Sequence, residues 1–129
     1  MELPLHFFAI FTNIDHKQPD WSMIYQLCIP ETLILKKNKE ELLTYNLERF
    51  IEPRKKILSD GTLTNFIEQE TMETTHIDGQ LAHRFSRYQK RGYLNGKYFL
   101  ETGNKFFQFV KIYSEWRINA VSWEDDINE

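Results

Sequence analysis

Apolar positions in the first half of the chain recur at the spacing of α-helices. The first stripe predicts a helix that ends near residues 15–19. Asp20 suits the N-cap of a second, short helix, which Pro30 would end because proline donates no backbone hydrogen bond. Residues 32–36 are β-prone and predict a short edge strand.

A third helix is expected to begin at Asn38, because Glu41 three residues later completes a capping box. Its apolar stripe continues to Leu58, with a kink at Pro53, and Asp60-Gly61 ends it.

From Thr62 onward apolar positions alternate with polar ones, which is the period of a β-strand. Asp78-Gly79 and Asn95-Gly96 are dipeptides favoured in two-residue hairpin turns, and Ser114-Glu115 provides a third reversal. These turns predict four strands, over residues 63–77, 81–94, 97–113 and 116–123.

Helices followed by antiparallel strands indicate one α+β domain over residues 1–129. Residues 1–61 are expected to be mainly helical and residues 62–124 to form the sheet. The acidic tail at residues 125–129 is expected to fray.

Composition narrows the class of protein. Aromatic residues make up 15% of the 129 residues and glycine occurs only five times, which suits a sheet around a deep interior. A net charge of −3 provides no attraction to nucleic acid. Cys28 is the only cysteine, and we see neither a signal peptide nor a membrane span. We therefore expect a cytoplasmic protein with no nucleic acid and no membrane as partner.

The hairpin turns also predict the strand register. If the reversal at Asp78-Gly79 is tight, His83 lies opposite Thr74, and Arg87 lies opposite Glu70. Asn95-Gly96 would place Gln108 opposite His83 and Phe106 opposite Phe85, unless a bulge at Gly92 or Gly103 shifts the register.

Side-chain alternation then assigns two faces to the sheet. The face toward the helices would carry Phe66, Glu68, Glu70, Met72, Thr74, His83, Phe85, Arg87, Phe106, Gln108 and Val110. The other face is more polar and is placed outward. Its apolar strip of Ile67, Tyr88, Phe107 and Phe109 predicts a homodimer through the outer sheet face.

Five polar residues of the inward face would be costly to bury unless they are paired or reach a wet cavity: Glu68, Glu70, His83, Arg87 and Gln108. One interpretation is a binding site. The other is a cross-strand ion pair between Glu70 and Arg87 near an open rim, with His83 a satisfied core histidine.

Two further residues are left with alternatives. Arg54 lies on the helix stripe that faces the sheet, so it either extends to the rim or pairs with a buried acid such as Glu68 or Glu70. Trp123 faces inward if the Ser114-Glu115 turn has two residues and outward if it has one more.

Four segments carry a resemblance to a known family. They are FIEPRKKILSDG (residues 50–61), AHRFSRY (82–88), KFFQFVK (105–111) and WRINAVSWEDD (116–126). In this order and spacing the chain resembles the NTF2-like superfamily, in particular its SnoaL-like and ketosteroid-isomerase-like group. The resemblance implies a cone, in which a strongly curved antiparallel sheet packs on three N-terminal helices around a pocket, with frequent dimerisation.

The function predicted first is a pocket that binds a small, partly apolar organic molecule. Its expected ligand-binding residues are Arg54, Glu68, Phe85, Arg87, Phe106, Gln108 and Trp123. One alternative is a proton-transfer enzyme of the isomerase or dehydratase type with Glu70 or His83 as its base, and another is a non-catalytic dimerisation module. The four histidines form no ligand motif, so no metal is expected, and nothing implies a cofactor.

Overall fold

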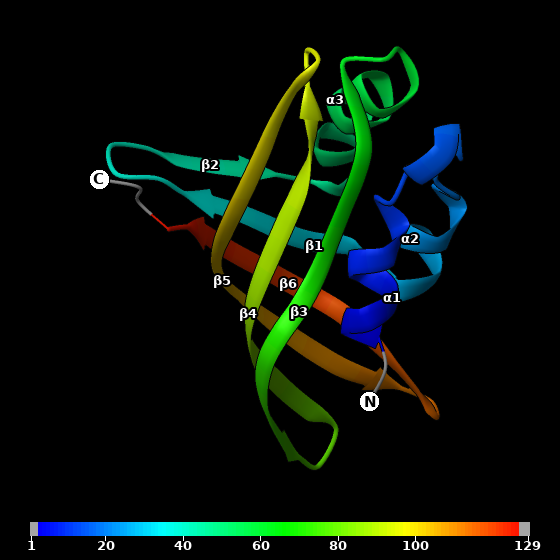
Figure 1. Cartoon of the computed structure of the whole chain (residues 1–129). Coiled ribbons are helices and arrows are strands. Elements are labelled where there is room, and N and C mark those ends of the chain that lie inside the picture. The colour runs from blue at the N-terminus through cyan, green and yellow to red at the C-terminus, as the bar shows by residue number, and fades with distance from the viewer. Residues whose placement is uncertain (1–2, 127–129) are drawn as a thin grey trace.

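A computed structural model describes residues 3–126 of the chain (Figure 1). A six-stranded sheet has the order β2-β1-β6-β5-β4-β3, and every pairing is antiparallel except that of β1 with β6. The strands are β1 (Cys28–Lys37), β2 (Leu42–Tyr45), β3 (Leu63–Asp78), β4 (Leu81–Leu94), β5 (Lys97–Ile112) and β6 (Glu115–Asp125). The α+β class is confirmed, and the last four strands lie within a few residues of their predicted bounds.

The helices lie on one side of the twisted sheet (Figure 1). They are α1 (Leu3–Ile10), the 3-10 turn η1 (Ile14–His16), α2 (Ser22–Leu27) and α3 (Leu47–Ser59). None of the helices within residues 3–126 has the length and apolar character that crossing a bilayer requires.

The third helix begins later than predicted. Asn38 does accept bonds from the backbone amides of Glu40 and Glu41, at 3.2 and 2.9 Å, but these close the turn between β1 and β2. Asn46 caps α3 instead, because its side chain accepts a bond from the Arg49 amide at 2.8 Å. An asparagine before two amides serves a turn as well as a helix, so the capping pattern was ambiguous.

Two further details differ from expectation. Residues 32–36 belong to β1, which lies between β2 and β6 and is therefore not an edge strand. Asp126 is anchored by its amide, which donates to the Thr102 carbonyl at 2.8 Å, so the acidic tail does not fray at this position. The rest of the predicted tail, residues 127–129, lies outside the described residues.

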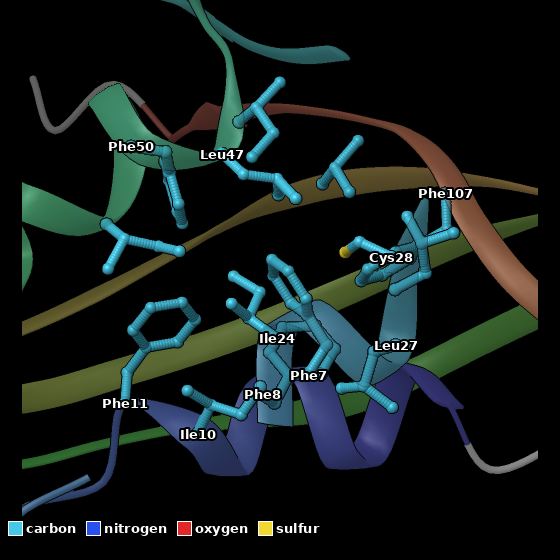
Figure 2. Close-up of a cluster of buried hydrophobic side chains, with 14 of the residues drawn as sticks. Phe7, Phe8, Ile10, Phe11, Ile24, Leu27, Cys28, Leu47, Phe50 and Phe107 are labelled. Carbon is cyan, nitrogen blue, oxygen red and sulfur yellow. The ribbon is translucent and has the colours of Figure 1, made fainter. Parts of the chain in front are cut away.

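The hydrophobic core fills the space between the helices and the sheet (Figure 2). Phe7 and Phe8 of α1 both pack edge-on against Phe107 of β5, with ring centroids 5.6 and 5.8 Å apart. Phe50 of α3 contacts Phe11 at 5.7 Å and extends this cluster towards Trp123 of β6 at 5.6 Å. Edge-to-face contacts between aromatic rings add to the stabilisation from buried area.

The predicted register of the first hairpin is wrong. Asp78 pairs with Leu81, so the two turn residues are Gly79 and Gln80, and His83 lies opposite His76. Of these two turn residues only Gly79 has a positive φ, of 62°, as in a type II′ turn with glycine first. The prediction had placed glycine second, as in a type I′ turn. Close to the turn, each β4 residue therefore lies opposite a residue two positions further along β3, which leaves the same side chains together on each face of β4. The wrong step was the choice of the inward face, because the set placed outward is the buried one.

The second hairpin forms as predicted. Asn95 and Gly96 both have positive φ, of 52° and 79°, as a type I′ turn requires. Gln108 lies opposite His83 and Phe106 opposite Phe85. Because β5 keeps its predicted register to β4, the two strands share their faces, and the set predicted to face outward is the buried one on both. The side chains that face the helices are therefore Ala82, Arg84, Ser86, Tyr88, Lys105, Phe107 and Phe109.

Bulges restore part of the prediction on the neighbouring strands. The register of β3 shifts between Glu70 and Met72, so Glu70, Glu68 and Phe66 face inward as predicted, whereas Met72 and Thr74 do not. On β6 the turn falls at Tyr113-Ser114, and the register against β5 shifts between the pairs formed by Gln108 and Phe109. Val121 and Trp123 consequently face inward and are buried.

Candidate functional site

A cavity of about 480 Å³ lies between α3 and the inner face of the sheet. Its walls are mostly apolar and include Phe11, Phe50, Ile57, Leu63, Phe66, Leu94, Phe99 and Trp123. Six charged side chains of the described residues also line it: Lys36, Arg54, Glu68, Lys90, Glu101 and Lys105. Apolar walls with a few placed polar groups are typical of small-molecule sites of this size.

The sequence of α3 places Arg54 on the cavity wall. Phe50, Arg54 and Leu58 follow one another at intervals of four, so they share the face of the helix that points to the sheet. Phe50 and Leu58 are buried and hold this face against the core. Arg54 is thereby held on the cavity wall instead of on the outer surface of the helix.

Aromatic rings surround the Arg54 guanidinium. Its central carbon lies 3.8 Å from the centroid of the Phe50 ring and 5.7 Å from those of Tyr45 and Trp123. Its Nη1 donates to the Phe50 carbonyl at 3.0 Å. Burial lowers the pKa of Arg54, and the neighbouring Tyr45 and Glu68 oppose this shift. The expected pair with a buried acid does not form, because Glu68 pairs with Lys105 and Glu70 with Arg84.

Glu68 is paired with Lys105 at the base of the cavity. The carboxylate accepts a short hydrogen bond from Nζ, and both side chains are nearly buried. The ammonium lies 4.7 Å from the ring centroid of Phe8 and 4.9 Å from that of Tyr88. Burial lowers the pKa of Lys105, and Glu68 opposes this shift. The pair satisfies two charges that would otherwise be costly in an apolar surrounding.

A second group of charges lies at the rim. Lys90 is 3.0 Å from Asp125 and 3.5 Å from Glu101, and Lys36 is 3.6 Å from Asp125. The buried Tyr88 hydroxyl donates a short hydrogen bond to Asp125. Burial alone would raise the pKa of Asp125. The charge of Lys90 and the hydrogen bonds from Tyr88 and Lys90 outweigh burial, so the pKa lies below its usual value.

Three of the predicted site residues line this cavity: Arg54, Glu68 and Trp123. Glu70 also faces inward, but it is not part of the cavity lining. Arg84 donates to both of its carboxylate oxygens, and the Ser86 hydroxyl donates at 2.5 Å. The side chains of Glu70 and Arg84 are 6% and 7% exposed, so the acid is sealed in this ion pair.

The other predicted site residues lie on the opposite face of the sheet, because the face of β4 and β5 that meets the helices is the one predicted to point outward. They are His83, Phe85, Arg87, Phe106 and Gln108. His83 contacts His76 with ring centroids 5.4 Å apart, and Phe85 contacts Phe106 at 5.1 Å. Arg87 binds Asn104 at 2.8 Å and Asp126 at 2.6 Å, so the expected pair with Glu70 does not form. Three of them line a wider hollow of about 680 Å³: His83, Phe106 and Gln108.

Sequence reasoning missed the buried polar residues Lys105 and Tyr88, which it assigned to the outer face. A signal was present in β5, where Phe107 and Phe109 alternate with Phe106, Gln108 and Val110. Two large rings on one face favour it as the core-facing one, but Lys105 and Lys111 share that face and made it the more polar of the two. Within residues 3–126, no three side chains of His, Cys, Asp or Glu converge to hold a metal ion.

Comparison with known proteins identifies the fold. No family model matches the sequence, and no curated protein matches it. An NTF2-like superfamily protein from Salmonella enterica serovar Typhimurium aligns with a TM-score of 0.77 at 16% identity, over 98% of this chain and 88% of that one. An NTF2-like protein from Cytophaga hutchinsonii aligns with a TM-score of 0.72 at 12% identity, over 97% and 93%. The chain therefore has the NTF2-like fold, an α+β cone, as the resemblance implied.

Proposed function

We propose that the chain is a binding protein whose cone cavity takes up a small, partly apolar organic molecule. The observation that carries the proposal is the cavity of about 480 Å³ that α3 leaves open against the sheet. Its apolar side chains provide the surface that a ligand would bury, and its charged side chains are held in place by ion pairs and ring contacts. Pre-positioned polar groups within apolar walls orient a ligand without a large ordering cost.

Two leucines of similar exposure provide a matched test. Leu94 lines the cavity and is 46% exposed, whereas Leu100 is 50% exposed and is absent from the lining. Ligand-observed NMR and thermal shift would be measured with phenyl-, naphthyl- and octyl-substituted acids, amides and amines. We expect Leu94→Trp to abolish binding by filling the cavity and Leu100→Trp to leave it intact. Binding that survives Leu94→Trp, or no binding by wild-type protein, contradicts the proposal.

The proton-transfer alternative was tied to Glu70 and His83. The cavity lining contains neither residue, and Glu70 is sealed by Arg84 and Ser86. A base must approach a bound substrate. Neither Glu70 nor His83 is therefore placed to act on a molecule in this cavity. Binding is the function that the geometry supports best.

The apolar strip predicted to form the dimer does not lie on the outer face, because Tyr88, Phe107 and Phe109 are buried. Other side chains of the outer sheet face favour a second role, self-association. Met72 and Phe106 are 56% and 52% exposed there, and Phe85 contacts Phe106. The centre of this face is apolar or uncharged, while ion pairs such as Arg87 with Asp126 and Arg117 with Glu115 carry both signs nearby. A face that carries both signs is complementary to itself, so we propose that a second copy of the chain covers it in a homodimer.

A further inference from the structure

Arg54 differs from the lysines of the cavity in having no carboxylate of the described residues at contact distance, although the charge of Glu68 acts on it from further away. Each lining lysine has a carboxylate within 4.0 Å: Lys105 has Glu68, Lys90 has Asp125 and Glu101, and Lys36 has Asp125. Within residues 3–126, no carboxylate lies within 4.0 Å of the Arg54 guanidinium. The cavity therefore contains one positive charge that the described part of the protein does not neutralise at short range.

This charge cannot be removed by proton loss. A buried lysine adapts to an apolar site by deprotonating, but a guanidinium stays protonated in proteins. Burial lowers the pKa of Arg54, yet from the high ordinary value of a guanidinium. A cation in a partly dry cavity is most stable with an anion beside it. The described residues provide no carboxylate at contact distance, so an anion from solution would meet a guanidinium that no acid of the described residues contacts.

The guanidinium is also prepared for one kind of anion. The Phe50 ring below it, at 3.8 Å, fixes the plane of the group, and one Nη1 donor is engaged by the Phe50 carbonyl. Tyr45 also forms a hydrogen bond with the guanidinium. The nitrogens of Arg54 that have no partner are not buried, because no buried side-chain nitrogen of the described residues lacks one. A planar fork with free edge donors matches the two oxygens of a carboxylate.

We propose, on the basis of the binding role above, that the cavity ligand is a small carboxylate with an apolar body. The carboxylate binds Arg54, and the body lies against Phe66, Phe99 and Leu94. Glu68 does not oppose this arrangement at close range because its charge is compensated by Lys105. The acids at the cavity are all engaged by lysines, so they leave no comparable site for a ligand cation.

The test compares ligands that differ only in charge. Phenylpropionate, naphthoate and octanoate would each be titrated beside the matching amide and amine, by calorimetry or ligand-observed NMR. We expect wild-type protein to bind each carboxylate at least about tenfold more tightly than its amide, and the amine more weakly than both. Arg54→Gln should remove this preference. Arg49→Gln, at an exposed arginine on the same helix, should retain it.

The outcomes separate this inference from the proposed function. Equal affinity for carboxylate and amide in wild-type protein overturns the inference while leaving a binding cavity in place. No binding of any compound, or binding that Leu94→Trp leaves intact, overturns the proposed function itself. The wild-type comparison decides even if Arg54→Gln fails to fold. Arg54→Lys, which keeps the charge but loses the planar fork, should bind the carboxylates with reduced preference.

Discussion

The ring of Tyr88 on β4 lies over Gly103 on β5, and its hydroxyl reaches across that strand to Asp125 on β6. Tyr88 and Gly103 are directly paired, as are Gly103 and Asp125. A Cβ at position 103 would lie 2.5 Å from the Glu124 carbonyl oxygen and closer still to the Tyr88 hydroxyl. The missing side chain of Gly103 therefore allows one hydrogen bond to join three strands beside the cavity.

Gly103→Ala should destabilise the protein by about 2 kcal/mol or more, because both close contacts are with groups that are held in place. Tyr88→Phe keeps the ring and loses only the hydroxyl, so a smaller loss of about 1–2 kcal/mol is expected. Denaturant unfolding of both variants would measure these changes. A neutral Gly103→Ala would show that β6 does not need to lie so close to β5.

Lys105→Met should lower the free energy of unfolding by about 3–5 kcal/mol, because it leaves the Glu68 carboxylate buried without its partner. The double variant Lys105→Met with Glu68→Leu should recover most of that loss. Lys111→Met, at a partly buried lysine on the same strand, is the matched control and should cost less than about 1 kcal/mol. If all three variants unfold alike, the pair is not the source of the effect.

Asn13 joins the helical part of the chain to β3, where the pairing of β3 with β4 is interrupted between Thr64 and Ile67. Its side chain accepts from the Phe66 amide at 2.7 Å and donates to the carbonyls of Leu58 and Leu63. Asn13→Ala should cost about 2–4 kcal/mol, because the buried Phe66 amide loses its partner. Thermal and denaturant unfolding would measure the loss.

The control for Asn13 is Asn65→Gly in the same bulge. Asn65 has a φ of 48°, which glycine adopts without strain, and it gives up only an exposed bond to the Asp15 amide. A change within about 1 kcal/mol is expected. An equal loss in both variants would indicate that the bulge as a whole, and not the Asn13 amide, carries the stability.

Asp126 makes stability dependent on acid pH. Hydrogen bonds from Arg87 and Thr102 lower the pKa of Asp126 from 3.8 to about 2. Because the folded pKa is the lower one, this stabilisation is present above about pH 4 and is lost as the pH falls through about 2. Asp126→Asn should be less stable at pH 7 by under about 1 kcal/mol, since the pair is largely exposed.

The measurement is the melting temperature of wild type and Asp126→Asn between neutral and acid pH. The difference between the two proteins should shrink below about pH 4 and vanish near pH 2. Glu52→Gln, at an exposed acid of α3, is the charge-matched control and should show no such convergence. A constant difference at every pH would contradict the role of the carboxylate charge.

Phe106→Glu should convert the proposed homodimer into a monomer, because it places a charge at the centre of the outer face. Sedimentation velocity over a range of concentrations would measure the change. Tyr25→Glu is the control, since Tyr25 is an exposed ring, 58% accessible, on α2 away from the sheet. A wild-type protein that sediments as a monomer at high concentration would contradict the dimer.

The sequence determined the elements that depend on local chemistry. Alternation and turn dipeptides predicted the last four strands, and Asn95-Gly96 predicted the pairing of β4 with β5, because a turn with two positive φ values leaves one choice of register. The helical stripe predicted that Arg54 faces the sheet. These features follow from neighbours along the chain, so no distant contact was needed to infer them.

The tertiary structure decided which face of each strand meets the helices. The turn at Gly79 does not decide this, because its register differs from the predicted one by two positions and leaves the same side chains on each face of β4. Bulges in β3 and β6 reverse the alternation locally. Packing settles the choice of face, because burying Phe107 and Phe109 removes more apolar surface from water than burying Phe106 and Gln108 would. The partners of Glu68, Glu70 and Arg54 depended on that choice, and so did the composition of the cavity.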